Sequence, residues 1–120
     1  MIIKNKNNGK VLALKAWECR TLRERCRGLM FRKISSDEAC VLVSDYESLL
    51  NSSIHMMFVP QPLHVIWLND DREVVSVKKL PKANLLTWWR TYAPSKPAKY
   101  VIELLDKKGT LVGDKLQFIK

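Results

Sequence analysis

The distribution of apolar and polar positions along the chain predicts many short strands and almost no helix. Within residues 73–79, Val75 and Val77 alternate with Ser76 and Lys78, the period-two pattern of a strand with one buried face. Further strands are expected at residues 2–6, 10–15, 39–44, 53–59, 63–68, 100–105 and 115–119. Short strands joined by turns are typical of a small barrel or sandwich, not of repeated strand–helix–strand units. We therefore predict a mostly β (α+β) fold, a small barrel-like antiparallel or mixed sheet.

One short helix is expected at residues 21–28. Thr21 and Glu24 have the spacing of a capping box, in which each side chain bonds the backbone amide of the other residue. Gly28 then supplies the left-handed conformation that ends many helices. The apolar residues 29–31 follow immediately, and we expect them to turn inward and close the core.

Prolines mark the irregular parts of the chain. Pro60 and Pro62 cannot donate ladder hydrogen bonds, so a bend is expected between the strands on either side of them. Residues 81–97 contain three more prolines and resist regular assignment. A loop of this length is often functional.

Length and composition indicate an ordinary globular domain. The chain has 120 residues, 47% hydrophobic and 28% charged, so we expect one domain over residues 1–120. The first residues are too polar for a secretory signal, and no apolar run approaches the ~18 residues of a membrane span. A cytoplasmic protein without a membrane span is expected. The three cysteines lack zinc-like pairing and are interpreted as reduced, small apolar residues.

The charge balance points toward an anionic partner. Twenty-one basic residues against 12 acidic residues give a net charge of +9 and a sequence pI near 9.7. Such a field attracts phosphate polymers or anionic lipid, although it also serves plain solubility. The basic residues gather in three stretches: Arg20, Arg23, Arg25, Arg27, Arg32 and Lys33; Lys78, Lys79 and Lys82; Arg90, Lys96 and Lys99. If two stretches share a face, a phosphate-contacting surface results.

The long loop carries a group of large aromatic residues beside a cation. Trp88, Trp89, Arg90 and Tyr92 lie within five positions of one another. Such residues can form a stacking platform for bases, or anchor a protein partner. Alternatively, a tryptophan folds back as a lid on one end of the barrel.

Evidence for catalysis or metal binding is slight. His55 and His64 are the only histidines, and they could face each other across the proline bend to form a polar site, with Cys40 or Asp45 as a third ligand. Two histidines do not complete a metal centre, so no metal or cofactor is expected. The chain has no nucleophile elbow, phosphate loop or paired-carboxylate motif. Glu103 lies on the strand face opposite Ile102 and Leu104, where we expect it to face solvent.

Several segments together resemble the prokaryotic family of domains of unknown function numbered 192. They are Arg25–Arg32 (RCRGLMFR), Ser53–Pro60 (SIHMMFVP), Pro62–Leu68 (PLHVIWL), Val101–Leu104 (VIEL) and Val112–Asp114 (VGD). The resemblance covers most of the chain and implies a compact, mostly β, barrel-like domain with one short helix. It implies no activity. The chain departs from the family pattern at His64, where an aspartate is expected, and at the shortened segment 106–109.

We therefore predict a non-enzymatic binding domain with a basic surface for nucleic acid or another polyanion, using Arg27, Arg32, Trp88, Trp89, Arg90 and Tyr92. One alternative is a small-molecule or protein-interaction module with an aromatic rim at the barrel mouth. A second alternative is a metal-dependent enzyme. The oligomeric state is open.

Overall fold

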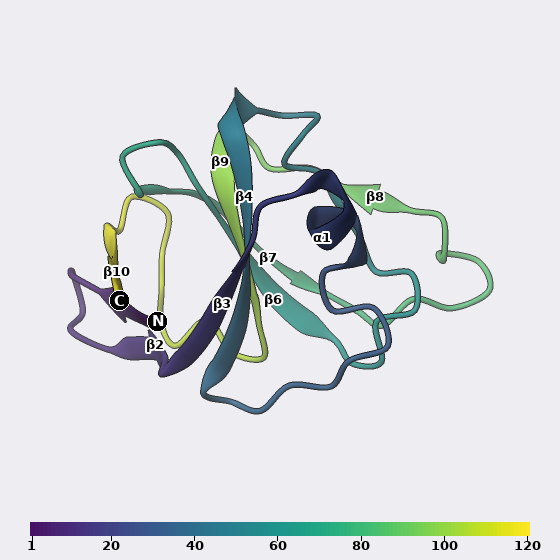
Figure 1. The fold of residues 1–120 in the computed structure, drawn as a ribbon, viewed down its shortest axis with the longest axis horizontal. Coiled ribbons are helices and arrows are strands. Elements are labelled where there is room, and N and C mark those ends of the chain that lie inside the picture. Colours follow the sequence, from purple (N-terminus) through teal and green to yellow (C-terminus); the bar gives the residue numbers. More distant parts are fainter.

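The computed structural model describes all residues from 1 to 120, and it consists of ten strands and one short helix (Figure 1). The elements are β1 Ile2–Asn5, β2 Val11–Ala13, β3 Lys15–Cys19, α1 Leu22–Arg27, β4 Glu38–Ser48, β5 Ile54–His55, β6 Leu63–Leu68, β7 Val74–Leu80, β8 Thr91–Tyr92, β9 Ala98–Leu104 and β10 Leu116–Ile119. The predicted mostly β class with one short helix is confirmed.

The strands form three open sheets and do not close into a barrel. The largest sheet has the order β3-β4-β9-β6-β7, the second β10-β1-β2, and the third consists of β5 and β8. All pairs are antiparallel except β3 with β4. The edge strands β3 and β7 of the large sheet do not pair with each other, so the barrel-like arrangement that we expected is corrected to a set of packed sheets.

One parallel pair makes the large sheet mixed, which the prediction allowed, although the sequence pattern did not indicate which strands pair in parallel. Strand β3 runs into α1 and returns through β4 beside it, with Lys15 opposite Glu38 and Cys19 opposite Leu42. Parallel neighbours require a crossover connection, and here the crossover contains the only helix. The helix therefore lies over one face of the large sheet.

The large sheet has an apolar core on each face. On β4, Val41 and Val43 belong to the cluster that also contains residues of β1, β2 and β10, whereas Cys40 and Leu42 belong to the cluster on the opposite face. Figure 1 shows the three-stranded sheet on one side of the large sheet and α1 with β8 on the other. Central strands buried on both faces have continuous apolar runs instead of clean alternation.

The helix begins and ends at the residues that its sequence predicts. Thr21 Oγ1 accepts a hydrogen bond from the Glu24 amide at 3.1 Å, and Glu24 Oε1 accepts from the Thr21 amide at 3.1 Å. Gly28 ends the helix with a φ of +45°, but its ψ of −118° lies outside the left-handed helical region that we predicted for it. No residue of α1 is buried. The helix is therefore stabilised by the capping bonds at its ends and not by a buried apolar face.

The segment after the helix is only partly internal. Leu29 is buried and Met30 is half-buried, as expected, but Phe31 is 73% exposed. The prediction that all three residues close the core is therefore wrong for Phe31. Its φ of +60° turns the side chain away from the core, onto the surface described below.

The segments around the prolines are less regular than expected. The strand predicted at residues 53–59 is reduced to Ile54–His55, which pairs with Thr91–Tyr92 from the long loop. The rest of residues 81–97 has no strand or helix, as predicted. No helix in the structure has the length and hydropathy that a membrane crossing requires.

Candidate functional site

A pocket of about 220 Å³ opens between α1, the segment 50–55 and β9. Its apolar lining comes from Leu22, Leu29, Leu42, Leu50, Ile54, Val59 and Val101. The polar and charged residues of its lining include Arg25, Arg27, Asn51, His55 and Glu103. Because these residues come from the helix, a loop and two sheets, the pocket exists only in the folded chain.

Glu103 is the one acidic residue of the pocket, and it is buried. Its exposed fraction is 3%, and Oε1 has no hydrogen-bond partner in the protein. Burial, and to a lesser extent the nearby Cys19 thiol, raises the pKa of Glu103 to about 8. The expectation that Glu103 faces solvent is wrong, because the sheet face opposite Ile102 and Leu104 is covered by the helix and the loops.

Gly28 makes room for the Glu103 carboxyl group. A Cβ atom at this position would lie 3.0 Å from Glu103 Oε1, and the φ of +45° is one that other residues rarely adopt. Glycine therefore meets two demands at once, a helix end and close approach to the carboxyl group. The sequence indicated the first demand only.

Arg25 contributes a second incompletely bonded group. Its Nη1 donates a hydrogen bond to Ser44 Oγ on β4 at 3.1 Å. Its Nε is buried and has no partner. The lining of one pocket thus contains an unpaired donor and an unpaired acceptor.

The two histidines lie in different sheets and do not face each other. His55, on β5, accepts a hydrogen bond from the Met57 amide at Nδ1 (3.2 Å), so its Nε2 donates to the Cys26 carbonyl (3.1 Å). This places His55 at the pocket and joins β5 to the helix end. His64, on β6, accepts from the Lys107 amide at 2.9 Å, and desolvation lowers its pKa. No group of three or more His, Cys, Asp or Glu side chains is placed to hold a metal ion.

The three thiols differ sharply in exposure. Cys19 and Cys40 are buried with their Sγ atoms 3.4 Å apart, whereas Cys26 is exposed at the pocket. The contact with Cys19, together with burial, raises the pKa of the Cys40 thiol. All three cysteines are free.

In the native protein, only one thiol is expected to react rapidly with Ellman's reagent, because the reagent must reach the sulfur atom. Cys26 is exposed and reacts first, whereas the buried Cys19 and Cys40 react only after unfolding. A Cys26→Ser variant is expected to show no rapid phase. Rapid reaction of two or three thiols in the wild type would contradict the burial of the Cys19–Cys40 pair.

A second concavity, which we call the aromatic groove, lies beside the pocket. It encloses about 730 Å³ and is lined by Phe31, Met57, Phe58, Val59, Pro60, Lys82, Ala83, Asn84, Leu85 and Trp88. The rings of Phe31 and Phe58 stack with centroids 5.0 Å apart, and the Phe31 amide donates to the Phe58 carbonyl at 2.8 Å. Both residues have a φ of +60°. The structure thus brings two segments far apart in the sequence into one exposed aromatic wall.

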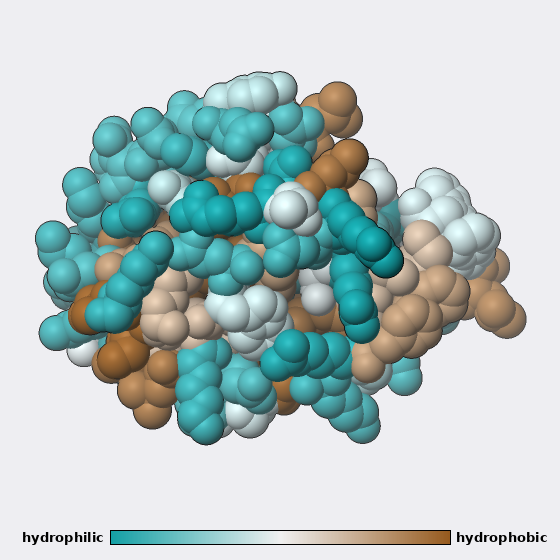
Figure 2. Space-filling model, viewed as in Figure 1, coloured by the Kyte–Doolittle hydropathy of each residue, from teal (hydrophilic) through white to brown (hydrophobic).

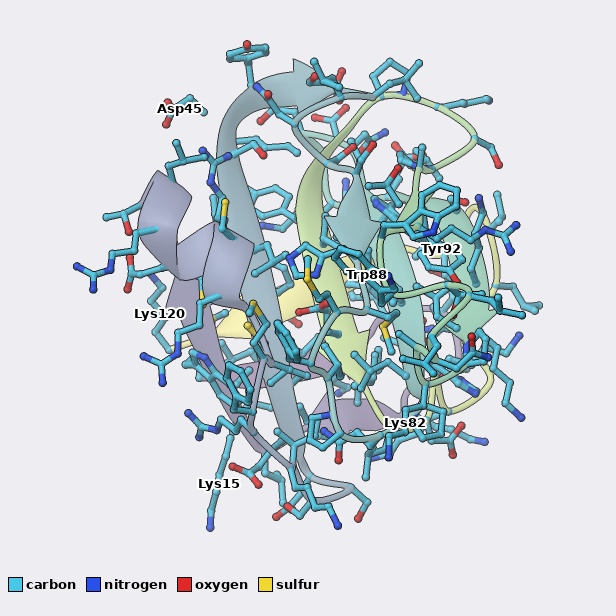
Figure 3. The ribbon with its side chains drawn as sticks, turned by 90° about the vertical axis from the view of Figure 1, so that its right-hand side faces the viewer. Lys15, Asp45, Lys82, Trp88, Tyr92 and Lys120 are labelled. Carbon is cyan, nitrogen blue, oxygen red and sulfur yellow. The ribbon has the colours of Figure 1, made fainter.

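The long loop provides the opposite wall, and its tryptophans do not form a lid. Trp88 is 51% exposed and Trp89 is 67% exposed, and Leu85 and Leu86 are still more open. Figure 2 shows apolar residues gathered at the end of the molecule where Figure 1 draws this loop. In Figure 3 Trp88 lies near the middle of this end, with Tyr92 and Lys82 toward one side.

The predicted cationic residues are distributed over several places. The guanidinium carbon of Arg90 lies 5.4 Å from the centroid of the Tyr92 ring, in the long loop of residues 81–97. Arg27 lines the pocket instead of the groove. Arg32 stacks on Trp17 at 4.0 Å and lies 3.7 Å from Glu38. Of the eight predicted site residues, only Trp88 lines the groove, and Arg27 and His55 line the pocket.

Sequence reasoning missed Glu103, Arg25, Phe31 and Phe58 as site residues. A glutamate inside the apolar run Val101–Leu104 is a usable signal, because charged residues are rarely buried without a purpose. Phe31 and Phe58 gave a weaker signal, because apolar residues close to a glycine or a proline are ordinarily internal.

The chain resembles known proteins over nearly its whole length. It is 36% identical over 118 residues to a UPF0127 protein of Thermococcus sibiricus, covering 95% of this chain and 72% of the relative. It is 31% identical over 118 residues to a UPF0127 protein of Pyrococcus furiosus, covering 95% of each chain. A crystal structure of a protein of unknown function from Novosphingobium aromaticivorans shares the fold, with a TM-score of 0.81 at 20% identity over 98% of this chain and 84% of that one.

The family profile described as "Uncharacterized ACR" matches residues 3–118, which include the segment Arg25–Arg32, the aromatic wall and the strand of Glu103. The resemblance expected from the sequence is confirmed by this match and by the two archaeal relatives. The chain belongs to the DUF192 family.

Proposed function

We propose that the protein is a non-enzymatic binding domain whose aromatic groove takes unpaired bases of a single-stranded nucleic acid. The observation that carries this proposal is the exposed stacked pair Phe31 and Phe58, which lines one open groove together with Trp88. Aromatic side chains that stand free in a groove are what base stacking requires. The proposal unites the predicted polyanion partner with the predicted aromatic rim.

The charge around the groove supports an anionic ligand. No acidic residue lines the groove, and Lys82 does. Residues 74–102 include the long loop of residues 81–97 and contain no aspartate or glutamate except Glu103's neighbours beyond their end. They have six basic residues: Lys78, Lys79, Lys82, Arg90, Lys96 and Lys99. A phosphate backbone next to stacked bases would meet no acidic side chain from this part of the chain, and Lys82 in the groove lining carries a positive charge, whereas Lys99 is paired with Asp70 at 3.1 Å.

The runner-up is a protein partner that uses the same surface. Trp, Tyr and Arg dominate many protein interfaces, and the exposed Leu85 and Leu86 add apolar area. A protein ligand would not require the one-sided charge of residues 74–102. The two candidates therefore differ in their dependence on salt and on Lys82.

The test is fluorescence anisotropy with labelled single-stranded DNA and RNA of about 15 nucleotides, titrated at increasing salt. We expect binding at low salt, and we expect Trp88→Ala or the double change Phe31→Ala with Phe58→Ala to weaken it about 5- to 150-fold, because a stacked base contributes ~1–3 kcal/mol. Tyr46→Ala is the matched control, since Tyr46 is 62% exposed but lies outside the groove.

A variant that removes the charge of Lys82 separates base stacking from electrostatic attraction to the phosphates. Lys82→Gln is expected to lower the salt slope by about one charge, whereas Lys4→Gln, on β1, is expected to change it less. No binding at low salt would refute the proposal. Equal binding by wild type and by both aromatic variants would also refute it, because it would leave only nonspecific charge.

A further inference from the structure

The pocket that contains Glu103 is a separate feature from the groove, and its chemistry is different. Its lining combines seven aliphatic side chains with one carboxyl group and two arginines. The groove has no carboxyl group in its lining. The polar groups of the pocket that have no hydrogen-bond partner therefore indicate which ligand the pocket can bind.

Those groups are an acceptor and a donor. Glu103 is only 3% exposed, and its Oε1 has no partner, although leaving a buried polar group unpaired is destabilising. Arg25 Nε is also buried without a partner. No ion pair joins Arg25 to Glu103, since the only bond from the Arg25 guanidinium goes to Ser44. The protein thus leaves two complementary groups of one pocket unsatisfied by each other.

We infer that this pocket binds a small apolar α-amino acid, or a closely similar zwitterion, with its ammonium group at Glu103 and its carboxylate at Arg25. An ammonium group supplies the donors that the buried carboxyl group lacks, and it favours the ionised carboxylate, so ligand binding at pH 7 is expected to release the proton that the free protein holds on Glu103. A carboxylate supplies the acceptor that Arg25 Nε lacks, and Arg27 adds positive charge to the lining.

The size and lining of the pocket limit the rest of the ligand. A volume of about 220 Å³ lies below the roughly 300–1,000 Å³ of sites for drug-sized molecules, so the ligand is small. The aliphatic lining, to which Leu22 and Leu50 contribute, favours an aliphatic side chain such as that of leucine. Gly28 supports the same site, because any larger residue would press on the Glu103 carboxyl group.

The test is calorimetric titration of the whole chain with L-leucine at millimolar concentration. We expect binding by leucine, and binding at least about tenfold weaker by three analogues that each lack one part of it. N-acetyl-leucine lacks the ammonium group, 3-methylbutylamine lacks the carboxylate, and glycine lacks the apolar side chain. The absence of leucine binding would overturn the inference. Equal binding of N-acetyl-leucine and leucine would overturn it too, since Glu103 would then have no ammonium to recognise.

Variants assign the contacts. Glu103→Gln and Arg25→Met are each expected to weaken leucine binding at least about tenfold, whereas Arg23→Met, an exposed arginine of the same helix outside the pocket, is expected to leave it unchanged. Circular dichroism checks that each variant is folded. If Arg25→Met does not fold, Glu103→Gln decides, and leucine binding by a folded Glu103→Gln at wild-type strength would overturn the inference.

The reaction rate of the Cys26 thiol provides a second measurement of leucine binding, which does not depend on calorimetry. The thiol is exposed at the pocket, so bound leucine is expected to slow its reaction with Ellman's reagent. The same concentration of N-acetyl-leucine is expected to leave the rate unchanged. Nucleic-acid binding by the groove is expected to be independent of Glu103 and of leucine, so the two proposals fail or succeed separately.

Discussion

Replacing Glu103 by glutamine is expected to raise the free energy of unfolding at pH 7 by about 3 kcal/mol. The folded protein holds this carboxyl group with a pKa of about 8, whereas an unfolded chain has one near 4.5. Between these values the folded state keeps a proton that the unfolded chain has released, so stability falls as the pH rises, by about 1.4 kcal/mol per pH unit. Glutamine removes the titration and keeps the size of the side chain.

The measurement is urea unfolding of wild type and variant from pH 5 to pH 8. The two proteins are expected to have similar stability near pH 5 and to diverge toward pH 8, and only the wild type should show the steep decline. Titratable or charged groups near Glu103 include Cys40 from the adjacent strand β4, Cys19 from β3, Arg25 from α1 and His55 from β5. Both proteins contain all four groups, so their difference isolates residue 103.

Glu73→Gln is the matched control. Glu73 is exposed, and its side chain makes no hydrogen bond or ion pair in the structure, so the variant is expected to follow the wild-type pH curve. A Glu103→Gln curve that coincides with the wild-type curve at every pH would show that the carboxyl group is solvated. That result would contradict both its burial and the ligand inference.

Replacing Trp67 by alanine is expected to cost about 3–5 kcal/mol of unfolding free energy, a large part of the ~5–15 kcal/mol that stabilises a typical domain. Trp67 on β6 is fully buried, and its Nε1 donates to the Ser52 carbonyl at 2.7 Å. The change leaves a cavity in the core and removes the hydrogen bond that Trp67 donates to the carbonyl of the buried Ser52. The lost bond also holds the segment 50–53 in place, and this segment borders the pocket that contains Glu103.

Trp89→Ala is the matched control for this prediction, because Trp89 is 67% exposed. It is expected to change the free energy of unfolding by less than about 0.5 kcal/mol. Urea unfolding followed by far-ultraviolet circular dichroism compares the two variants without relying on tryptophan fluorescence. Similar losses for Trp67→Ala and Trp89→Ala would mean that the long loop packs on the body of the protein.

The features that the sequence predicted well are local ones. The capping box of Thr21 and Glu24 depends on two side chains that lie three positions apart. The strand Leu63–Leu68 was predicted with its true bounds, because Pro62 and Asn69 flank an apolar run. Each of these features is decided by residues within a few positions of one another.

The candidate site was predicted only in part, because its residues meet through long-range packing. Alternation correctly placed Glu103 on the face opposite Ile102 and Leu104, but it could not tell that the crossover through α1 covers that face. Phe31 and Phe58 are 27 positions apart, and their stacking depends on two residues with positive φ in separate loops. The parallel pairing of β3 with β4 has no local signal either.

By itself, then, the sequence determined the family, the mostly β class, the capped helix, the excess of positive charge and the irregular aromatic loop. Tertiary structure alone decided that the sheets stay open, that Phe31 faces out, and that Glu103 lies unpaired in a pocket beside Arg25. The physical reason is the range of the interactions. Caps, turns and strand periods arise from neighbouring residues, whereas burial and its effect on the pKa of Glu103 depend on which distant segments cover the strand.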